Sequence, residues 1–241
     1  MGQKVAIITG AGSGIGFATL NLLHKEGYIP YGIDLCFPDP AQFRHSFCDV
    51  GNEREVSAVY TEIIEAYGRI DVLVNCAGEH LGKFFEDTLT SEFDSIVSTN
   101  MRGMFFWIRE AMPSLQEVGG VIINIASGVS IAPDPTAPLY SASKAWVMNL
   151  STSLFLDRKR TGVRAHAVLP GATDTPFLAK VCENSPATIE ECGSNIPLGR
   201  LIRPEEIACD ILYIIEHGEH LGPVFDCSGG ETVNFKTEQR W

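Results

Sequence analysis

Short apolar, β-branched runs alternate along the chain with longer segments in which apolar residues recur at helical spacing. The runs predict buried strands at residues 4–9, 29–34, 71–75, 121–126, 163–170 and 223–227, and a further strand near Phe47. The longer segments predict helices at about residues 15–27, 52–67, 90–114, 140–160 and 205–217. Because no repeat or linker interrupts the alternation, we expect one α/β domain over residues 1–241.

Strand–helix–strand units of this kind build a Rossmann-type, doubly wound parallel sheet with helices on both faces. Such sheets bind ligands at the carboxyl ends of their strands, so the residues directly after each strand are the candidate site residues. The stretch 37–40 contains Pro38 and Pro40, and this predicts that no full helix connects the second and third strands.

A glycine-rich turn, Thr9–Gly16, lies where the first strand gives way to a helix. The free backbone N–H groups and the dipole at a helix N-terminus bind a pyrophosphate, and glycines allow close approach. The spacing is G-x-x-x-G-x-G through Gly10, Gly14 and Gly16, and the strict G-x-G-x-x-G pattern is not met. For the glycine motif alone, a tight turn without a ligand is the alternative.

Asp34 ends the second strand, eighteen residues after Gly16. A carboxylate at this position accepts hydrogen bonds from the adenosine ribose hydroxyls and repels a 2′-phosphate. Ser13 in the turn is uncharged, and no Lys or Arg follows Asp34 before Arg44. We therefore expect NAD as the cofactor, with NADP as the alternative.

Tyr140 and Lys144 are four residues apart, so they share one face of a predicted helix. A nearby ammonium stabilises a tyrosinate, which ordinarily forms only near pH ~10. Such a pair is a candidate acid/base, although the same spacing also occurs in surface pairs. Ser127 stands just beyond the strand at residues 121–126, where its hydroxyl can hold a substrate oxygen.

Along nearly its whole length the sequence resembles the short-chain dehydrogenase/reductase family. Asp49-Val50, the Asn75–Gly78 element and the Pro170–Thr175 segment match family motifs, except that Cys76 replaces an asparagine. The resemblance implies a catalytic tetrad of Asn100, Ser127, Tyr140 and Lys144. It implies that the cofactor contacts Gly10, Ser13, Gly14, Ile15, Gly16, Asp34, Asp49, Val50, Asn75, Ala77, Gly78, Tyr140, Lys144, Pro170, Gly171, Thr173 and Thr175.

The implied activity is NAD(H)-dependent hydride transfer between a secondary alcohol, or a cyclic diol, and the corresponding ketone. In it Tyr140 is the general acid/base, Ser127 holds the oxygen, Lys144 binds the nicotinamide ribose and lowers the pKa of Tyr140, and Asn100 positions a water. The resemblance also implies a substrate loop at about 176–197. Glu79 and His80 either line the substrate pocket or lie on its rim.

The interval between Asp34 and Asp49 is short, as in the subgroup containing 2,3-dihydro-2,3-dihydroxybenzoate dehydrogenase. Two alternatives remain: an NADP-dependent carbonyl reductase, and a dinucleotide-binding regulatory protein without turnover. An intact tetrad favours the enzyme over the regulatory protein.

A net charge of −12 and a pI near 4.9 argue against nucleic-acid and anionic-membrane partners and leave a small-molecule substrate. No apolar run is long enough to span a bilayer, and no export signal is recognised. The 7 cysteines show no C-x-x-C spacing, which favours reduced thiols in a cytoplasmic protein. No metal is expected, since His217–His220 is typical of a solvated turn. Two predicted helices carry more aromatic residues than one face of a sheet can cover: Phe105, Phe106, Trp107, Trp146 and Phe155. These residues predict a subunit interface in a homo-oligomer, a tetramer or a dimer.

Overall fold

A single parallel sheet organises the protein, whose structure is a computed structural model describing residues 2–38, 43–183 and 188–233. Its 7 strands follow the order β3-β2-β1-β4-β5-β6-β7, as the predicted Rossmann-type, single-domain fold requires. The strands are β1 (Val5–Thr9), β2 (Ile29–Asp34), β3 (Arg44–Phe47), β4 (Val72–Asn75), β5 (Val121–Ile125), β6 (Arg164–Pro170) and β7 (Val224–Cys227).

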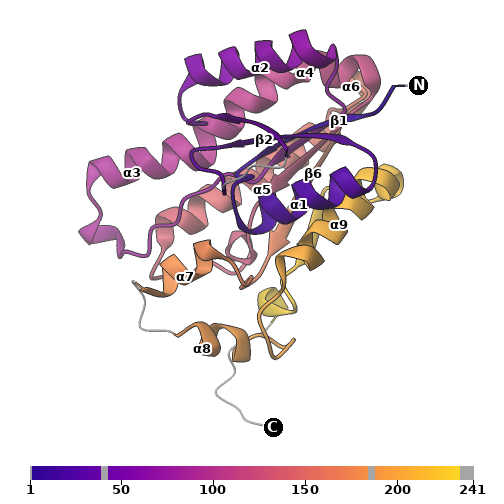
Figure 1. The fold of residues 1–241 in the computed structure, drawn as a ribbon. Helices are drawn as coiled ribbons and strands as arrows, with labels where there is room; N and C mark the ends of the chain where they lie inside the picture. Colours follow the sequence, from indigo (N-terminus) through magenta and orange to yellow (C-terminus); the bar gives the residue numbers. More distant parts are fainter. Residues whose placement is uncertain (1, 39–42, 184–187, 234–241) are drawn as a thin grey trace.

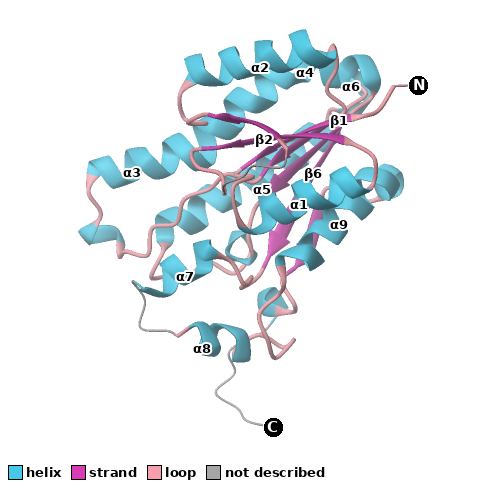
Figure 2. Cartoon of the chain, in the orientation of Figure 1, coloured by secondary structure: helices cyan, strands magenta, loops and turns pink. Residues whose placement is uncertain are grey.

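Helices cover both faces of this sheet (Figures 1 and 2). α1 (Gly14–Lys25) and α9 (Pro204–His217) pack on one face, and α2 (Glu53–Tyr67), α4 (Met104–Val118) and α5 (Pro138–Leu156) pack on the other. Side chains of β1 alternate between two cores, because successive residues of a strand point to opposite faces. Ile7 joins the α2–α4–α5 core, and Ile8 joins the α1–α9 core.

The carboxyl ends of the central strands lie level with one another. Thr9 pairs with Asn75 across β1 and β4, and Asn75 pairs with Asn124 across β4 and β5. The segments that follow these strands therefore leave the sheet from a common edge, which is where the sequence predicts the site.

The segment predicted as one helix at residues 90–114 is helical throughout but not uniform. α3 (Thr90–Ile96) runs into a π-helical turn, η2 (Val97–Gly103), and then into α4. α4 continues past the predicted end to Val118, and Gly119 in the left-handed conformation, with φ 64°, follows it. The predicted helix at 140–160 begins earlier, at Pro138, and α6 (Arg158–Thr161) follows it.

Two short helices, α7 (Pro176–Glu183) and α8 (Ile189–Ser194), occupy the region predicted as a substrate loop. Figure 1 shows them, in orange, at the end of the molecule opposite the N-terminus. The thiols of Cys182 and Cys192 lie 3.7 Å apart and join the two helices. Residues 184–187 of this region lie outside the described part of the chain, as does part of the proline-containing stretch before β3.

Part of the predicted subunit interface is instead core. Trp107 is fully buried and Phe106 is 7% exposed, both inside the α2–α4–α5 core. Phe105 is 48% exposed and stays a candidate interface residue. Within the described residues, no helix combines the length and the apolar composition needed to cross a bilayer.

Candidate active site

The glycine-rich turn after β1 has room only for glycine at several positions. Gly10 and Gly14 have φ values of 66° and 52°, in the left-handed region. A Cβ on Gly16 would lie 2.1 Å from the carbonyl oxygen of Gly10, and a Cβ on Gly10 would lie 2.7 Å from the nitrogen of Ala77. Ser13 stands at the N-cap position of α1, but its side chain makes no capping hydrogen bond, so the backbone N–H groups of the first turn stay available. The uncapped N-terminus of α1 therefore fits a pyrophosphate.

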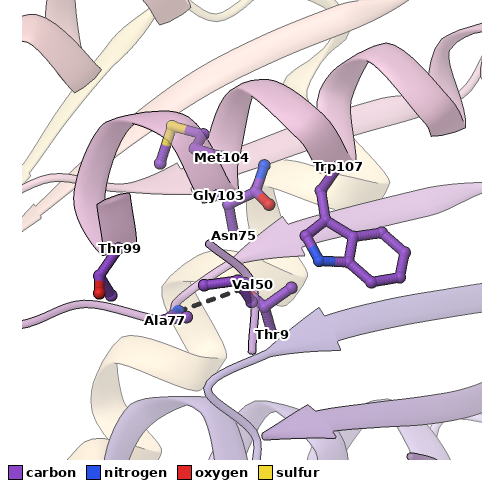
Figure 3. A pocket seen from close by; sticks show the side chains of 8 residues that line it. All are labelled: Thr9, Val50, Asn75, Ala77, Thr99, Gly103, Met104 and Trp107. Atoms are coloured by element: carbon purple, nitrogen blue, oxygen red, sulfur yellow. Dashed lines mark hydrogen bonds between the residues drawn. The ribbon is translucent and has the colours of Figure 1, made fainter. Parts of the chain in front are cut away.

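Thr9 ties the loop after β4 to the end of β1. Its Oγ1 accepts hydrogen bonds from the backbone nitrogens of Cys76 and Ala77, both at 3.1 Å, and Figure 3 shows the bond to Ala77. Burial raises the pKa of the Cys76 thiol to about 12, although the Gly16 backbone N–H and Lys144 oppose this. Cys76, the departure from the family motif, is therefore an uncharged packing residue at neutral pH.

Asp34 is held beside the glycine turn by backbone donors. Its Oδ2 accepts from Gly12 at 2.8 Å, and its Oδ1 accepts from Leu35 at 2.7 Å and Cys36 at 3.3 Å. A Cβ on Gly12 would lie 3.0 Å from this carboxylate. Among the residues that the structure describes, no ion pair involves Asp34, and residues 39–42 contain no Lys or Arg. The turn thus presents a carboxylate and no cation.

A narrow hollow, too small for a water molecule, lies beneath α4 and η2 at the edge of the sheet (Figure 3). Val50, Asn75 and Ala77, three of the predicted cofactor residues, line it. The side-chain amide of Asn75 donates to Asn124 Oδ1 at 2.9 Å. This buried hydrogen bond joins the side chains of β4 and β5 and holds Asn75 in place. Asn75 Oδ1 and the indole nitrogen of Trp107 both line the hollow and have no hydrogen-bond partner among the described residues.

The segment after β6 approaches the glycine turn. A Cβ on Gly14 would lie 2.9 Å from Cγ2 of Thr175. Thr175 Oγ1 donates to the Thr173 carbonyl at 3.2 Å and accepts from Leu178 N, also at 3.2 Å, at the start of α7. Two predicted cofactor motifs, far apart in the sequence, are therefore in contact.

Ser127, Tyr140 and Lys144 converge at the end of β5, as the sequence predicts. The Ser127 hydroxyl lies close enough to the Tyr140 phenol to act on its pKa. The Lys144 ammonium lies 5.8 Å from the centre of the Tyr140 ring and donates to the Ile125 carbonyl at 2.8 Å. Tyr140 is 8% exposed and Lys144 is 4% exposed, so this group is largely shielded from solvent.

Asn100 sits in the π-helical turn η2 and fixes the loop after β4. It accepts from Glu79 N at 2.8 Å and donates to the Glu79 carbonyl and to Ser143 Oγ, both at 2.9 Å. Gly78, just before Glu79, lies next to this arrangement, since a Cβ there would stand 3.4 Å from Lys144 Nζ, an ordinary contact distance. π-Helical turns are frequent at functional sites, and this one places Asn100 against Ser143, the residue before Lys144 in α5.

Burial sets the protonation states of the site. It raises the pKa of Tyr140 to about 12, although the Ser127 hydroxyl acts to lower it. Burial also lowers the pKa of Lys144 to about 8. In the protein by itself the pKa of Tyr140 is therefore raised, because desolvation dominates and the nearby Cys76 and Glu231 act in the same direction. The lowering of this pKa by Lys144 stays a prediction. At neutral pH Tyr140 is a protonated phenol, able to donate a proton to a carbonyl oxygen.

Two aromatic rings and one carboxylate near Tyr140 complete the site. The His80 ring lies 4.7 Å and the Phe177 ring 6.4 Å from the Tyr140 ring, between centres. The sequence did not decide whether His80 lines the substrate pocket or lies on its rim. In the structure the His80 ring contacts the Tyr140 ring. Glu231, which sequence reasoning missed, accepts a hydrogen bond from Ala172 N at 3.2 Å. Its only sequence signal is its place just after the Ser228–Gly230 turn.

Comparison with known proteins agrees with this geometry. Residues 4–186 match the family described as short chain dehydrogenase. The chain is 31% identical to 4-formylbenzenesulfonate dehydrogenase of Comamonas testosteroni, over 97% of this chain and 99% of that protein. A ligand-free aldohexose dehydrogenase of Thermoplasma acidophilum is 28% identical with a TM-score of 0.93, covering 99% of this chain and 98% of that one. A 3-ketoacyl-(acyl-carrier-protein) reductase of Brucella melitensis, solved with NADH, is 28% identical with a TM-score of 0.86, covering 95% and 98%.

This chain therefore belongs to the short-chain dehydrogenase/reductase family. It is an oxidoreductase of the type that interconverts alcohols and ketones with a nicotinamide dinucleotide, NAD or NADP.

Proposed function

We propose that this protein is an NAD(H)-dependent dehydrogenase that transfers hydride between a secondary alcohol, or a cyclic diol, and the corresponding ketone. The observation that carries the proposal is the convergence of the Ser127 hydroxyl and the Lys144 ammonium on the buried Tyr140. A hydroxyl, a phenol and an ammonium together can hold a carbonyl oxygen and exchange a proton with it.

The cofactor proposal rests on the fit of two features to a dinucleotide. The uncapped N-terminus of α1, with its glycines, suits the pyrophosphate, and Asp34 suits an unphosphorylated adenosine ribose. Asp49, Val50 and the Asn75–Gly78 element are proposed to form the adenine side, and Pro170–Thr175 the nicotinamide side. When bound, the nicotinamide supplies the hydride chemistry.

The chain's own residues handle the oxygen and the proton. In reduction, Tyr140 donates its phenol proton to the carbonyl oxygen, and in oxidation the tyrosinate takes the alcohol proton. Ser127 donates a hydrogen bond to the same oxygen. Lys144, which donates to the Ile125 carbonyl beside Tyr140, also holds the nicotinamide ribose. Asn100 fixes the loop at Glu79. It also positions a water that connects Lys144 to solvent.

The region at about 176–197 is proposed to form the substrate loop of the single domain. Phe177, in α7, already contacts the active-site rings. The short connection between Asp34 and Asp49 supports a place near the 2,3-dihydro-2,3-dihydroxybenzoate dehydrogenase subgroup. We further propose that the protein is a cytoplasmic homo-oligomer, a tetramer or a dimer, with the exposed Phe105 at an interface.

The test is a screen for NAD- and NADP-linked oxidation of secondary alcohols, cyclic diols, hydroxy acids and sugars, with binding of each dinucleotide measured separately. We expect NADH formation with at least one substrate and tighter binding of NAD than of NADP. Turnover with a clear NADP preference would support the NADP-dependent carbonyl reductase instead. Tight NAD binding without turnover of any substrate would support a regulatory protein.

A further inference from the structure

Two thiols face each other on the short helices α7 and α8, which lie side by side (Figure 1). Cys182, near the end of α7, and Cys192, within α8, have their Sγ atoms 3.7 Å apart, at hydrogen-bond distance. Both are free cysteines and both are partly exposed, so a small molecule can reach them. The sulfurs of a disulfide are about 2.05 Å apart, so a closure of less than about 2 Å turns this contact into a bond.

α7 begins against the active site. The Phe177 ring, in its first turn, lies 6.4 Å from the Tyr140 ring and 6.2 Å from the His80 ring, between centres. Thr175 Oγ1 accepts from Leu178 N at 3.2 Å, and the Thr175 methyl group also meets the glycine turn after β1. The position of α7 therefore decides what surrounds the Tyr140 phenol.

α8 is anchored to the body of the protein. Gly193 is buried within it, and a Cβ there would lie 3.0 Å from Leu201 N. Ile196, just after α8, is 4% exposed and belongs to the α1–α9 core. Leu198 N donates to the Gly229 carbonyl at 3.2 Å. A covalent bond between the two thiols would therefore fix α7 to an anchored part of the fold.

We propose that Cys182 and Cys192 form a reversible disulfide when a low-molecular-weight disulfide oxidises them, and that this bond holds Phe177 against Tyr140 and slows turnover. Disulfides in reducing compartments are transient and serve catalysis or redox sensing, which agrees with the reduced thiols expected from the sequence. The effect on turnover rests on the proposed function, whereas formation of the bond does not.

Two thiol–disulfide exchange steps make the bond. A thiolate of the pair attacks one sulfur of the small disulfide, the S–S bond of that molecule breaks, and a small thiolate leaves and takes up a proton. The other cysteine then loses its proton and attacks the protein sulfur of the mixed disulfide. This step forms the Cys182–Cys192 bond and releases the second small thiolate, which is also protonated. The two protein thiols lose two electrons and two protons, and the small disulfide becomes two thiols.

The surroundings of the pair set the rate of this reaction. Burial raises the pKa of Cys192 to about 11, and the neighbouring Cys182, Glu231 and Glu191 act in the same direction. Because the thiolate is the attacking species, the pair should react slowly at neutral pH and faster as the pH rises. An uncharged oxidant, 2-hydroxyethyl disulfide, is the suitable probe, because the nearby carboxylates do not repel it.

The experiment treats reduced wild-type protein with 2-hydroxyethyl disulfide, blocks the remaining thiols with iodoacetamide and maps tryptic peptides by mass spectrometry. No Lys or Arg lies between Lys180 and Arg200, so both cysteines fall in one peptide, 181–200. We expect this peptide to escape alkylation and to be two hydrogen atoms lighter than its reduced form. The bond should form faster at about pH 9 than at about pH 7, and dithiothreitol should reverse it.

Two single variants control the chemistry. Cys182→Ser removes one partner and should leave Cys192 as a mixed disulfide with the reagent. Cys209→Ser removes an exposed thiol from α9 and should form the internal disulfide as the wild type does. Wild-type Cys182 and Cys192 that stay reduced, or that accumulate only as mixed disulfides, would overturn the inference.

Turnover is compared between the oxidised and the reduced state of each protein, so that each protein is its own reference. Oxidation should lower kcat/KM about tenfold or more in wild type and in Cys209→Ser, because α7 is fixed over the tyrosine. Cys182→Ser/Cys192→Ser, which keeps the exposed Cys36 and Cys209, should lose no activity on oxidation. An equal loss in this double variant would contradict the role of the bond.

Peptide mapping separates this inference from the proposed function, because it needs no substrate. A disulfide that forms in a protein without turnover supports the modification site, and the proposed function alone then fails. Turnover by the reduced protein without formation of the bond contradicts this inference alone. A bond that forms and leaves turnover unchanged contradicts its action through α7.

Discussion

A Cβ on Gly14 would lie 2.9 Å from Cγ2 of Thr175, so the glycine turn after β1 and the segment after β6 are in contact. Gly14 also has a φ of 52°, which an alanine adopts only with strain. We expect Gly14→Ala to lower the free energy of unfolding by about 1–3 kcal/mol and to weaken dinucleotide binding. Urea unfolding and fluorescence titration with NADH measure the two effects.

Thr175→Ser provides the matched control, because it removes the crowding methyl group and keeps the hydroxyl. The double variant Gly14→Ala/Thr175→Ser should recover part of the stability, while the strain from the positive φ should remain. Strictly additive effects of the two substitutions would contradict the contact.

Discrimination between NAD and NADP should depend on the charge of Asp34. Asp34→Asn removes the charge and keeps an oxygen to accept from Gly12, whereas Asp34→Ala removes both. Both variants should bind NADP more tightly relative to NAD by about tenfold, since a like-charge repulsion is lost. Only Asp34→Ala should also lose stability, by about 1–3 kcal/mol. Dissociation constants that do not change would show that this carboxylate does not face the ribose.

The buried Lys144 should leave a signature in the pH dependence of stability. Its pKa falls from 10.5 in the unfolded chain to about 8 in the fold, so between these values the unfolded chain binds more protons. The lysine therefore destabilises the fold most below pH 8, and its contribution becomes more favourable as the pH rises toward 10.5. Relative to Lys144→Met, wild-type stability should rise by about 2–3 kcal/mol across this window.

Differential scanning calorimetry of both proteins from pH 7 to about pH 10 measures this difference, and the titration of the tyrosines cancels because both proteins contain the same tyrosines. Lys144→Arg, which stays charged throughout, should not show the rise. If the difference in unfolding free energy between wild type and Lys144→Met did not change with pH, the lowered pKa of the buried Lys144 would be contradicted.

Features that depend on local pattern were predictable from the sequence. The strand order follows from strand–helix–strand units with right-handed crossovers, and the strands deviate from their predicted bounds by about a residue. The convergence of Ser127 with Tyr140 and Lys144 was predictable. Tyr140 and Lys144 are four residues apart and so share one face of a helix, and Ser127 follows a strand at the edge where such sheets bind ligands.

Features that depend on packing were not predictable. Trp107 and Phe106 formed part of the predicted interface, yet the helix buries them, because periodicity does not tell which side of an apolar helix faces the sheet. The raised pKa of Tyr140 depends on desolvation, which no residue spacing reveals. Glu231 lies more than a hundred residues after Ser127, and its approach depends on the left-handed turn at Gly229 and Gly230.

The most direct test of the account is the turnover of Tyr140→Phe, which removes one hydroxyl from a ring that stays packed against His80 and Phe177. Steady-state NAD-linked oxidation should be measured on the best alcohol found in the screen, beside NAD binding and thermal unfolding. We predict that kcat falls by about 10²–10⁴-fold, while NAD affinity and stability stay close to wild type. Turnover that persists at the wild-type rate would contradict the assignment of Tyr140 as the proton-transferring group.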